Sequence, residues 1–171
     1  MTVRMTKKLQ HSLGIKELPS SENKEKPHFI DEWYMNIFNI RNNWFFIFME
    51  STTFYTIVKP AQAINGSKAF IEYFQELIIE IFNRENERYL VKSFFINDMH
   101  LRNTENKAER RIIVDMVYHA ENMKYKKGQM KVFQELNEIP QALLQYKNPR
   151  EAFRYQLGEM IKNRSDEISF N

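Results

Sequence analysis

Hydrophobic and polar positions along the chain follow two patterns, a short alternating one and a longer helical one. Residues 2–6 alternate polar and apolar side chains, which is the period of a short strand. Three runs rich in aromatic and β-branched residues follow, at residues 33–41, 44–50 and 54–59. Asn42 and Asn43 separate the first two runs, and residues 51–53 separate the second and third. Since asparagine tolerates the left-handed geometry of tight turns, these runs predict three antiparallel strands joined by hairpins.

Longer segments with apolar residues three and four positions apart predict helices. Residues 67–84 show the clearest stripe, formed by Phe70, Phe74, Leu77, Ile78, Ile81 and Phe82. A second long helix is predicted from Thr104 to Lys124, and a last one begins at Asn148 and Pro149, an N-cap followed by a proline in the first turn. Shorter helices are predicted at residues 7–13 and 130–136. Residues 86–97 fit either a helix or a strand; we favour a helix, followed by a short strand at 99–102.

Together these elements predict a single α+β domain over residues 1–171. We expect a small, mainly antiparallel sheet, with its meander at about residues 33–59, packed against the two long helices and the C-terminal helix. Both faces of the first meander strand are apolar, so helices should cover at least one face of the sheet. The polar segment 16–28 predicts a mobile loop, and the tail 165–171 is expected to fray.

Composition removes several classes of protein. The 171 residues are 43% hydrophobic and 14% aromatic, with four Gly and no Cys. The absence of Cys excludes disulfide scaffolds, Cys-ligated zinc, iron–sulfur clusters and a Cys nucleophile. Four scattered Gly cannot form a Gly-rich phosphate loop, so we expect no cofactor of that kind and assign none.

The net charge of +3 hides a segmental pattern. Residues 1–26 carry six basic and three acidic residues, and residues 101–131 carry eight basic and four acidic ones. Residues 27–100 are acidic, with six basic and nine acidic residues, and residues 132–171 are nearly balanced, with five basic and six acidic ones. Dedicated duplex-DNA binders concentrate more positive charge than this. No long apolar run follows the first residues, and the stretch 44–49 is far shorter than the ~20 residues that span a bilayer. We therefore expect a cytoplasmic protein with no membrane partner.

Three residues of the predicted helix 104–124 are candidates for catalysis. Arg111, Asp115 and His119 follow each other at intervals of four, so their side chains are neighbours on the helix surface. Within the wider face from Arg110 to Glu121, a histidine could transfer protons and an arginine could stabilise phosphate charge, as in a nuclease. The alternative is a salt-bridged face exposed to solvent, which is more usual on an amphipathic helix.

Four lysines form the densest basic segment and are candidates for nucleic-acid binding: Lys124, Lys126, Lys127 and Lys131. Tyr118 precedes them and Tyr125 lies among them, and basic and aromatic side chains together can bind single-stranded nucleic acid. The alternative is a polar loop between helices. Asp98 and His100 would share one face of a strand, but no third ligand can be located, and we expect no metal site.

Several stretches of the chain carry a resemblance to a known family: residues 3–9, 33–40, 44–56, 102–104 with 112–116, and the ending 136–140 with 146–149. On these stretches the chain resembles a family of small bacterial proteins, some encoded on plasmids or phages, that is classed as a domain of unknown function. The segment 102–116 departs from the family pattern, since it lacks a Ser and a Gly. The resemblance implies an α+β domain of about this length, with no established activity, cofactor or catalytic residue.

The sequence assigns no biochemical function. The leading hypothesis is a non-enzymatic interaction or regulatory module of bacterial or mobile-element origin, with a protein partner or a second copy as its ligand. One alternative is a nucleic-acid-binding protein that uses the basic region 101–131. The other is a nuclease-like enzyme that uses the helix face from Arg110 to Glu121.

Overall fold

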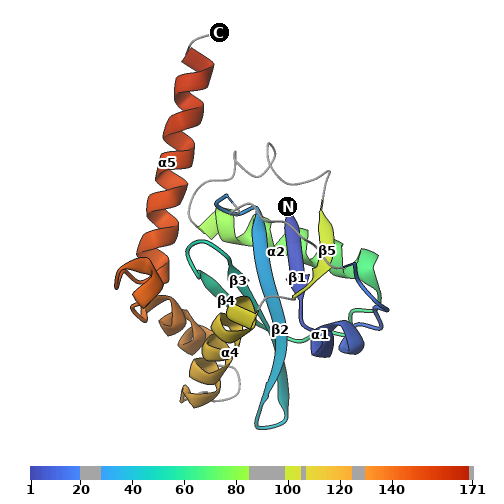
Figure 1. Ribbon diagram of the computed structural model, residues 1–171. Helices are drawn as coiled ribbons and strands as arrows, with labels where there is room; N and C mark the ends of the chain where they lie inside the picture. Colours follow the sequence, from blue (N-terminus) through green and yellow to red (C-terminus); the bar gives the residue numbers. More distant parts are fainter. Residues whose placement is uncertain (20–27, 85–98, 105–106, 125–129, 170–171) are drawn as a thin grey trace.

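The computed structural model describes residues 1–19, 28–84, 99–104, 107–124 and 130–169, and its centre is a five-stranded sheet (Figure 1). The strands are β1 (Thr2–Met5), β2 (Glu32–Ile40), β3 (Asn43–Glu50), β4 (Thr56–Pro60) and β5 (His100–Asn103). The α-helices are α1 (Lys7–Ser12), α2 (Ser67–Arg84), α4 (Lys107–Asn122) and α5 (Pro149–Ser169). Two 3₁₀ helices, η1 (Met130–Glu138) and η2 (Ala142–Leu144), lie between α4 and α5.

The sheet is mixed, with the order β4-β3-β2-β1-β5. Strand β1 pairs in parallel with both β2 and β5, whereas β2, β3 and β4 pair antiparallel in chain order. The buried side chains of Arg4 on β1 and Glu32 on β2 form an ion pair across two of the parallel strands. The prediction of a mainly antiparallel sheet with two long helices and a C-terminal helix is therefore wrong, although the class is α+β. Alternation reveals a strand at residues 2–6 but does not encode which strands it pairs with.

Helices cover both faces of the sheet. Alternate side chains of each strand point to opposite faces, so β2 sends Trp33 to one core and Tyr34 to the other. Helix α2 and the start of α5 cover the first face, where Phe74 contacts Trp33 edge-on with ring centroids 5.7 Å apart. Helices α4 and η1 cover the second face, where Phe133 packs against Phe45 at 5.3 Å (Figure 1). None of the helices in the described ranges has the length and apolar character needed to cross a bilayer.

The two hairpin turns owe their shape to particular side chains. Arg41 and Asn42 have φ angles of 50° and 64°, the left-handed geometry of the tight turn between β2 and β3. The turn between β3 and β4 folds around Glu50, whose carboxylate is fully buried. It accepts hydrogen bonds from the backbone N–H groups of Ile30, Thr52 and Thr53 and from both threonine hydroxyls. These bonds fix the point at which β4 begins.

Two predicted segments fall largely on residues that the structure does not describe. Residues 85–98, which contain the ambiguous segment 86–97, and most of the expected loop 16–28 lie outside the described residues. Helix α5 extends to Ser169, and the fraying of residues 165–171 stays a prediction.

Replacing Glu50 should weaken the fold strongly. Alanine leaves the N–H groups of Ile30, Thr52 and Thr53 without this acceptor, and each loss at the buried groups of Ile30 and Thr53 costs about 1–3 kcal/mol. We expect Glu50→Ala to lower the free energy of unfolding in urea by about 3 kcal/mol or more, and Glu50→Gln by less because its amide keeps one acceptor oxygen. The control is Glu17→Ala at an exposed position, with an expected change within about 0.5 kcal/mol. A Glu50→Ala protein as stable as this control would contradict the role given to the carboxylate.

Candidate functional site

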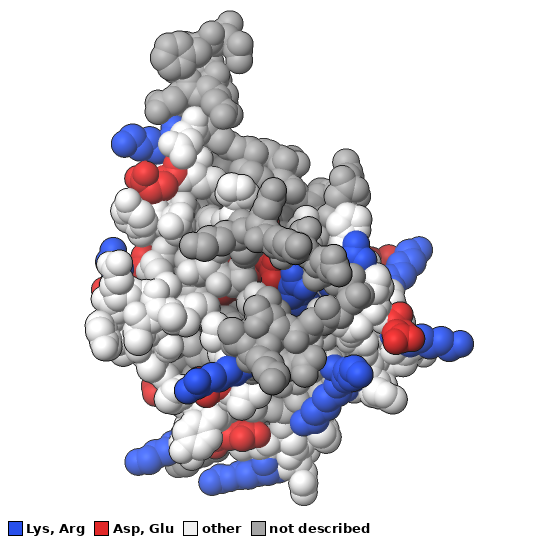
Figure 2. Space-filling model, in the orientation of Figure 1, with Lys and Arg blue, Asp and Glu red and all other residues white. Residues whose placement is uncertain are grey.

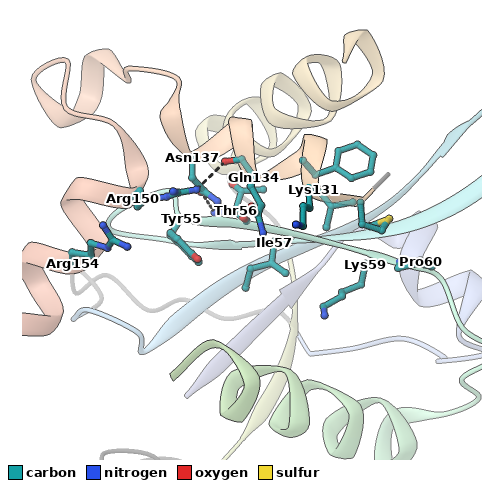
Figure 3. Close-up of a pocket in the computed structure, with 13 residues that line it drawn as sticks. Tyr55, Thr56, Ile57, Lys59, Pro60, Lys131, Gln134, Asn137, Arg150 and Arg154 are labelled. Atoms are coloured by element: carbon teal, nitrogen blue, oxygen red, sulfur yellow. Dashed lines mark hydrogen bonds between the residues drawn. The ribbon is translucent and has the colours of Figure 1, made fainter. Parts of the chain in front are cut away.

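A cavity of about 460 Å³ lies along the outer edge of β4, and we call it the edge cleft (Figure 3). Residues 55–60 form its floor, η1 forms the opposite wall and the first turns of α5 close one end. Its volume falls in the range of small-ligand pockets, which is roughly 300–1,000 Å³. Because β4 is the last strand on this side of the sheet, the cleft gives access to a sheet edge.

Asn137 partly closes that edge. Its side-chain amide donates to the carbonyl of Thr56 at 2.7 Å, and its side-chain oxygen accepts from the N–H of Thr56 at 2.6 Å. The carboxamide thus takes the place that a neighbouring strand would occupy at this residue. Asn137 is itself buried, so the two bonds also hold η1 against β4.

The backbone of Val58 faces the cleft and has no such partner among the described residues. Along two antiparallel strands, opposite residues alternate between pairs that hydrogen-bond to each other and pairs that do not. The backbone N–H of Glu50 donates to the carbonyl of Tyr55 at 3.0 Å, and the backbone N–H of Ala61 donates to the carbonyl of Trp44 at 2.8 Å. The backbone groups of the odd-numbered residues between 55 and 61 therefore face β3. The N–H and carbonyl of Thr56 and Val58 therefore point outward. Asn137 bonds to both backbone groups of Thr56. Among the described residues, no hydrogen bond to the N–H or carbonyl of Val58 is found.

Cationic side chains surround the edge cleft. Of the described residues that line it, Lys59, Lys131, Arg150 and Arg154 are basic and none is acidic. Figure 3 shows Arg150 and Arg154 near the Tyr55 end, and Lys59 and Lys131 near the Pro60 end.

Lys59 and Arg150 are already engaged in ion pairs in the free protein. Lys59 donates to both carboxylate oxygens of Glu80 at 2.7 and 2.8 Å. Arg150 pairs with Glu138 at 3.0 Å and also donates to the carbonyl of Gln134. Lys131 is exposed and has no ion pair within the described part of the chain. Lys131 thus brings to the cleft a positive charge that pairs with no described carboxylate, and this charge favours an anionic ligand.

Tyr73 on α2 lies near Glu80, the partner of Lys59. Burial, together with the negative charge of Glu80, raises the pKa of Tyr73 from 10.0 to about 12. The phenol of Tyr73 therefore stays protonated even well above physiological pH.

The three candidate catalytic residues line a second cavity, of about 620 Å³, between α4 and η2, which we call the α4 cavity. Arg111 and Asp115 are exposed and His119 is half-buried. Leu143 and Tyr118 on its rim are 73% and 63% exposed, and Phe54 and Met116 add apolar surface. Arg110 belongs to the same helix, and Glu121 is exposed near its end. Spacing on the helix thus brings the three candidates to one cavity, and their catalytic role stays a prediction.

The candidate nucleic-acid-binding lysines are only partly described. Lys124 is exposed just beyond α4, Lys131 lies on η1 in the edge cleft, and Lys126 and Lys127 fall outside the described residues. His100 is exposed on β5, and Asp98 is not described. Across the described ranges, no group of three or more His, Asp or Glu side chains is placed to hold a metal ion.

Sequence reasoning missed most of the edge cleft. Arg150 and Arg154 are four residues apart at the start of the C-terminal helix, a spacing that places two cations on one helix face. That spacing could have indicated a basic patch. No local signal distinguishes Asn137 from an ordinary polar residue near a turn, because its partner Thr56 is 81 residues away.

Fold and cleft together define an α+β domain with a mixed sheet and an accessible strand edge at β4. A family model described as a domain of unknown function, DUF6933, matches residues 2–152. This match covers most of the chain, so the chain belongs to the DUF6933 family. A search of curated proteins finds no match.

Removing the Asn137 side chain should loosen the edge cleft without unfolding the protein. Asn137→Ala removes two hydrogen bonds to the buried backbone of Thr56, which should lower the free energy of unfolding in urea by about 1–3 kcal/mol. Gln134→Ala is the matched control, because Gln134 lies on the same helix, is exposed and takes part in the Arg150 contact through its backbone carbonyl alone. Equal stability of the two variants would argue against Asn137 as the link between η1 and β4.

Proposed function

We propose that the chain is a non-enzymatic interaction module that binds an acidic protein partner in the edge cleft. The observation that carries this proposal is the set of four basic side chains and no acidic one among the described lining residues, next to an accessible strand edge. Arginine in particular forms paired hydrogen bonds with carboxylates. Complementary charge favours association with acidic partners and selects against basic ones.

A protein partner fits this cleft better than a nucleic acid does. Nucleic-acid binding draws its affinity from neutralising many phosphates along an extended basic surface. The four cations of the edge cleft line a single cavity, and its walls include the apolar residues Ile57, Val58 and Phe133. On the face seen in Figure 2, the described basic and acidic side chains are interspersed among uncharged ones.

A binding role also fits the edge cleft better than catalysis does. General acid–base catalysis most often uses a histidine and also uses carboxylates, and the described lining of the edge cleft holds neither. Arg111 and Asp115 in the α4 cavity are exposed to water, where electrostatic stabilisation of a transition state is weak. The nuclease hypothesis therefore ranks below binding.

The proposed setting is the cytoplasm of a bacterium, with the module encoded on or acting around mobile genetic elements. The support for this setting is the sequence resemblance described above. It adds nothing to the choice of ligand, which rests on the edge cleft alone.

Charge reversal in the cleft tests the proposal. The probes are a fluorescently labelled peptide of alternating Glu and Val and a labelled single-stranded DNA of equal charge, titrated by anisotropy at low and physiological salt. We expect the peptide to bind, and the double variant Lys131→Glu, Arg154→Glu to weaken binding by about tenfold or more. The matched control, Lys68→Glu with Lys162→Glu, makes the same charge change at exposed positions outside the cleft and should leave binding within about twofold.

Two outcomes would contradict the proposal. One is that the control variant weakens peptide binding as much as the cleft variant does, since binding would then follow net charge alone. The other is that only the DNA binds and that Lys124→Glu abolishes its binding, which would favour the nucleic-acid hypothesis for the basic region 101–131.

A further inference from the structure

We infer that the acidic partner binds as an extended segment that adds to the sheet at Val58, an inference that rests on the proposed function. Strand addition at an exposed edge is a common mode of peptide recognition, in which backbone hydrogen bonds supply affinity and side-chain contacts supply specificity. The edge cleft offers both, because an outward-facing peptide group lies between two pairs of basic side chains.

The free hydrogen-bonding groups define where the segment can pair. Thr56 is already bound by Asn137, so pairing stops at that residue. Val58 offers one N–H and one carbonyl, and Pro60, which has the same outward orientation, offers a carbonyl and no N–H. The segment therefore pairs over a short stretch, from Val58 to Pro60. So short an edge limits non-specific pairing with other strands.

Basic residues at both ends of this stretch favour an acidic segment. Arg150 and Arg154 lie toward the Tyr55 end, and Lys131 and Lys59 lie toward Pro60 (Figure 3). Side chains of an extended segment alternate in direction, so acidic residues at alternate positions can face the basic groups while the intervening ones contact the apolar wall.

A second copy of the chain is a poorer occupant. Pairing of two β4 edges would bring the same basic side chains of both copies together, and like charges across paired strands are destabilising. The charge of the edge cleft therefore favours a different, acidic chain over self-association.

A backbone-modified peptide tests strand addition on the unaltered protein. The probe is the labelled peptide of alternating Glu and Val, compared with the same peptide N-methylated at alternate amides. Methylation keeps charge and side chains but removes the donors that a paired strand needs. We expect the peptide methylated in the pairing register to bind at least tenfold more weakly, because one or two backbone hydrogen bonds are lost.

A proline substitution tests the same pairing from the protein side. The N–H of Val58 faces away from β3, so Val58→Pro removes the outward donor without breaking a ladder bond, as prolines on edge strands do. Val58→Ala is the matched control, since it loses a similar part of the buried side chain but keeps the N–H. We expect the proline variant to bind the unmodified peptide about tenfold more weakly than the alanine variant.

The outcomes separate this inference from the proposed function. If the peptides methylated in either register bind as tightly as the unmodified one, strand addition is wrong while acidic binding in the edge cleft stands. If the Val58→Pro protein folds and binds the unmodified peptide as tightly as the Val58→Ala protein does, strand addition is also wrong. If no acidic peptide binds at all, the proposed function fails first. A dimer in solution that Val58→Pro dissociates would replace the acidic partner with a second copy.

Discussion

The outward-facing peptide groups of β4 impose the constraint on which the edge cleft and its proposed ligand depend. A strand at the edge of a sheet exposes N–H and carbonyl groups that need partners, from the same chain, from water or from another chain. At Thr56 the side chain of Asn137 supplies both partners and holds η1 in place. At Val58 the edge faces a cavity instead. The cleft exists because η1 satisfies one peptide group of the edge and not the next.

The buried turn before β4 makes this arrangement possible. Glu50 gathers the backbone of Ile30, Thr52 and Thr53 around one carboxylate and so sets which residues of β4 face outward. A shift of one residue would exchange the outward and inward groups of the strand. It would place Ile57 in the position of Val58 and separate Asn137 from its partner. The geometry of the cleft thus depends on a carboxylate that lies outside it.

Helices and strands could be predicted from the sequence where a single hydrophobic periodicity dominates. Strand pairing and the edge cleft could not be predicted, because contacts between residues far apart in the chain determine them. Helix α2 matches the predicted range 67–84 because its apolar stripe is wide and uninterrupted. The place of β1 between β2 and β5 was not predictable, since alternation carries no information on pairing partner. Arg111, Asp115 and His119 meet at one cavity because helical spacing is local. The edge cleft depends on contacts between residues 56 and 137, which no local pattern shows.

Amide hydrogen exchange at β4, measured by NMR with and without the acidic peptide, tests the central claim most directly. In the free protein, the N–H of Val58 should exchange at least tenfold faster than those of Thr56, Ile57 and Lys59, which have partners in Asn137 or β3. Saturating peptide should slow Val58 to the rate of its neighbours. If Val58 is already as protected as its neighbours without peptide, or remains unprotected when peptide is bound, β4 does not present an open edge for strand addition.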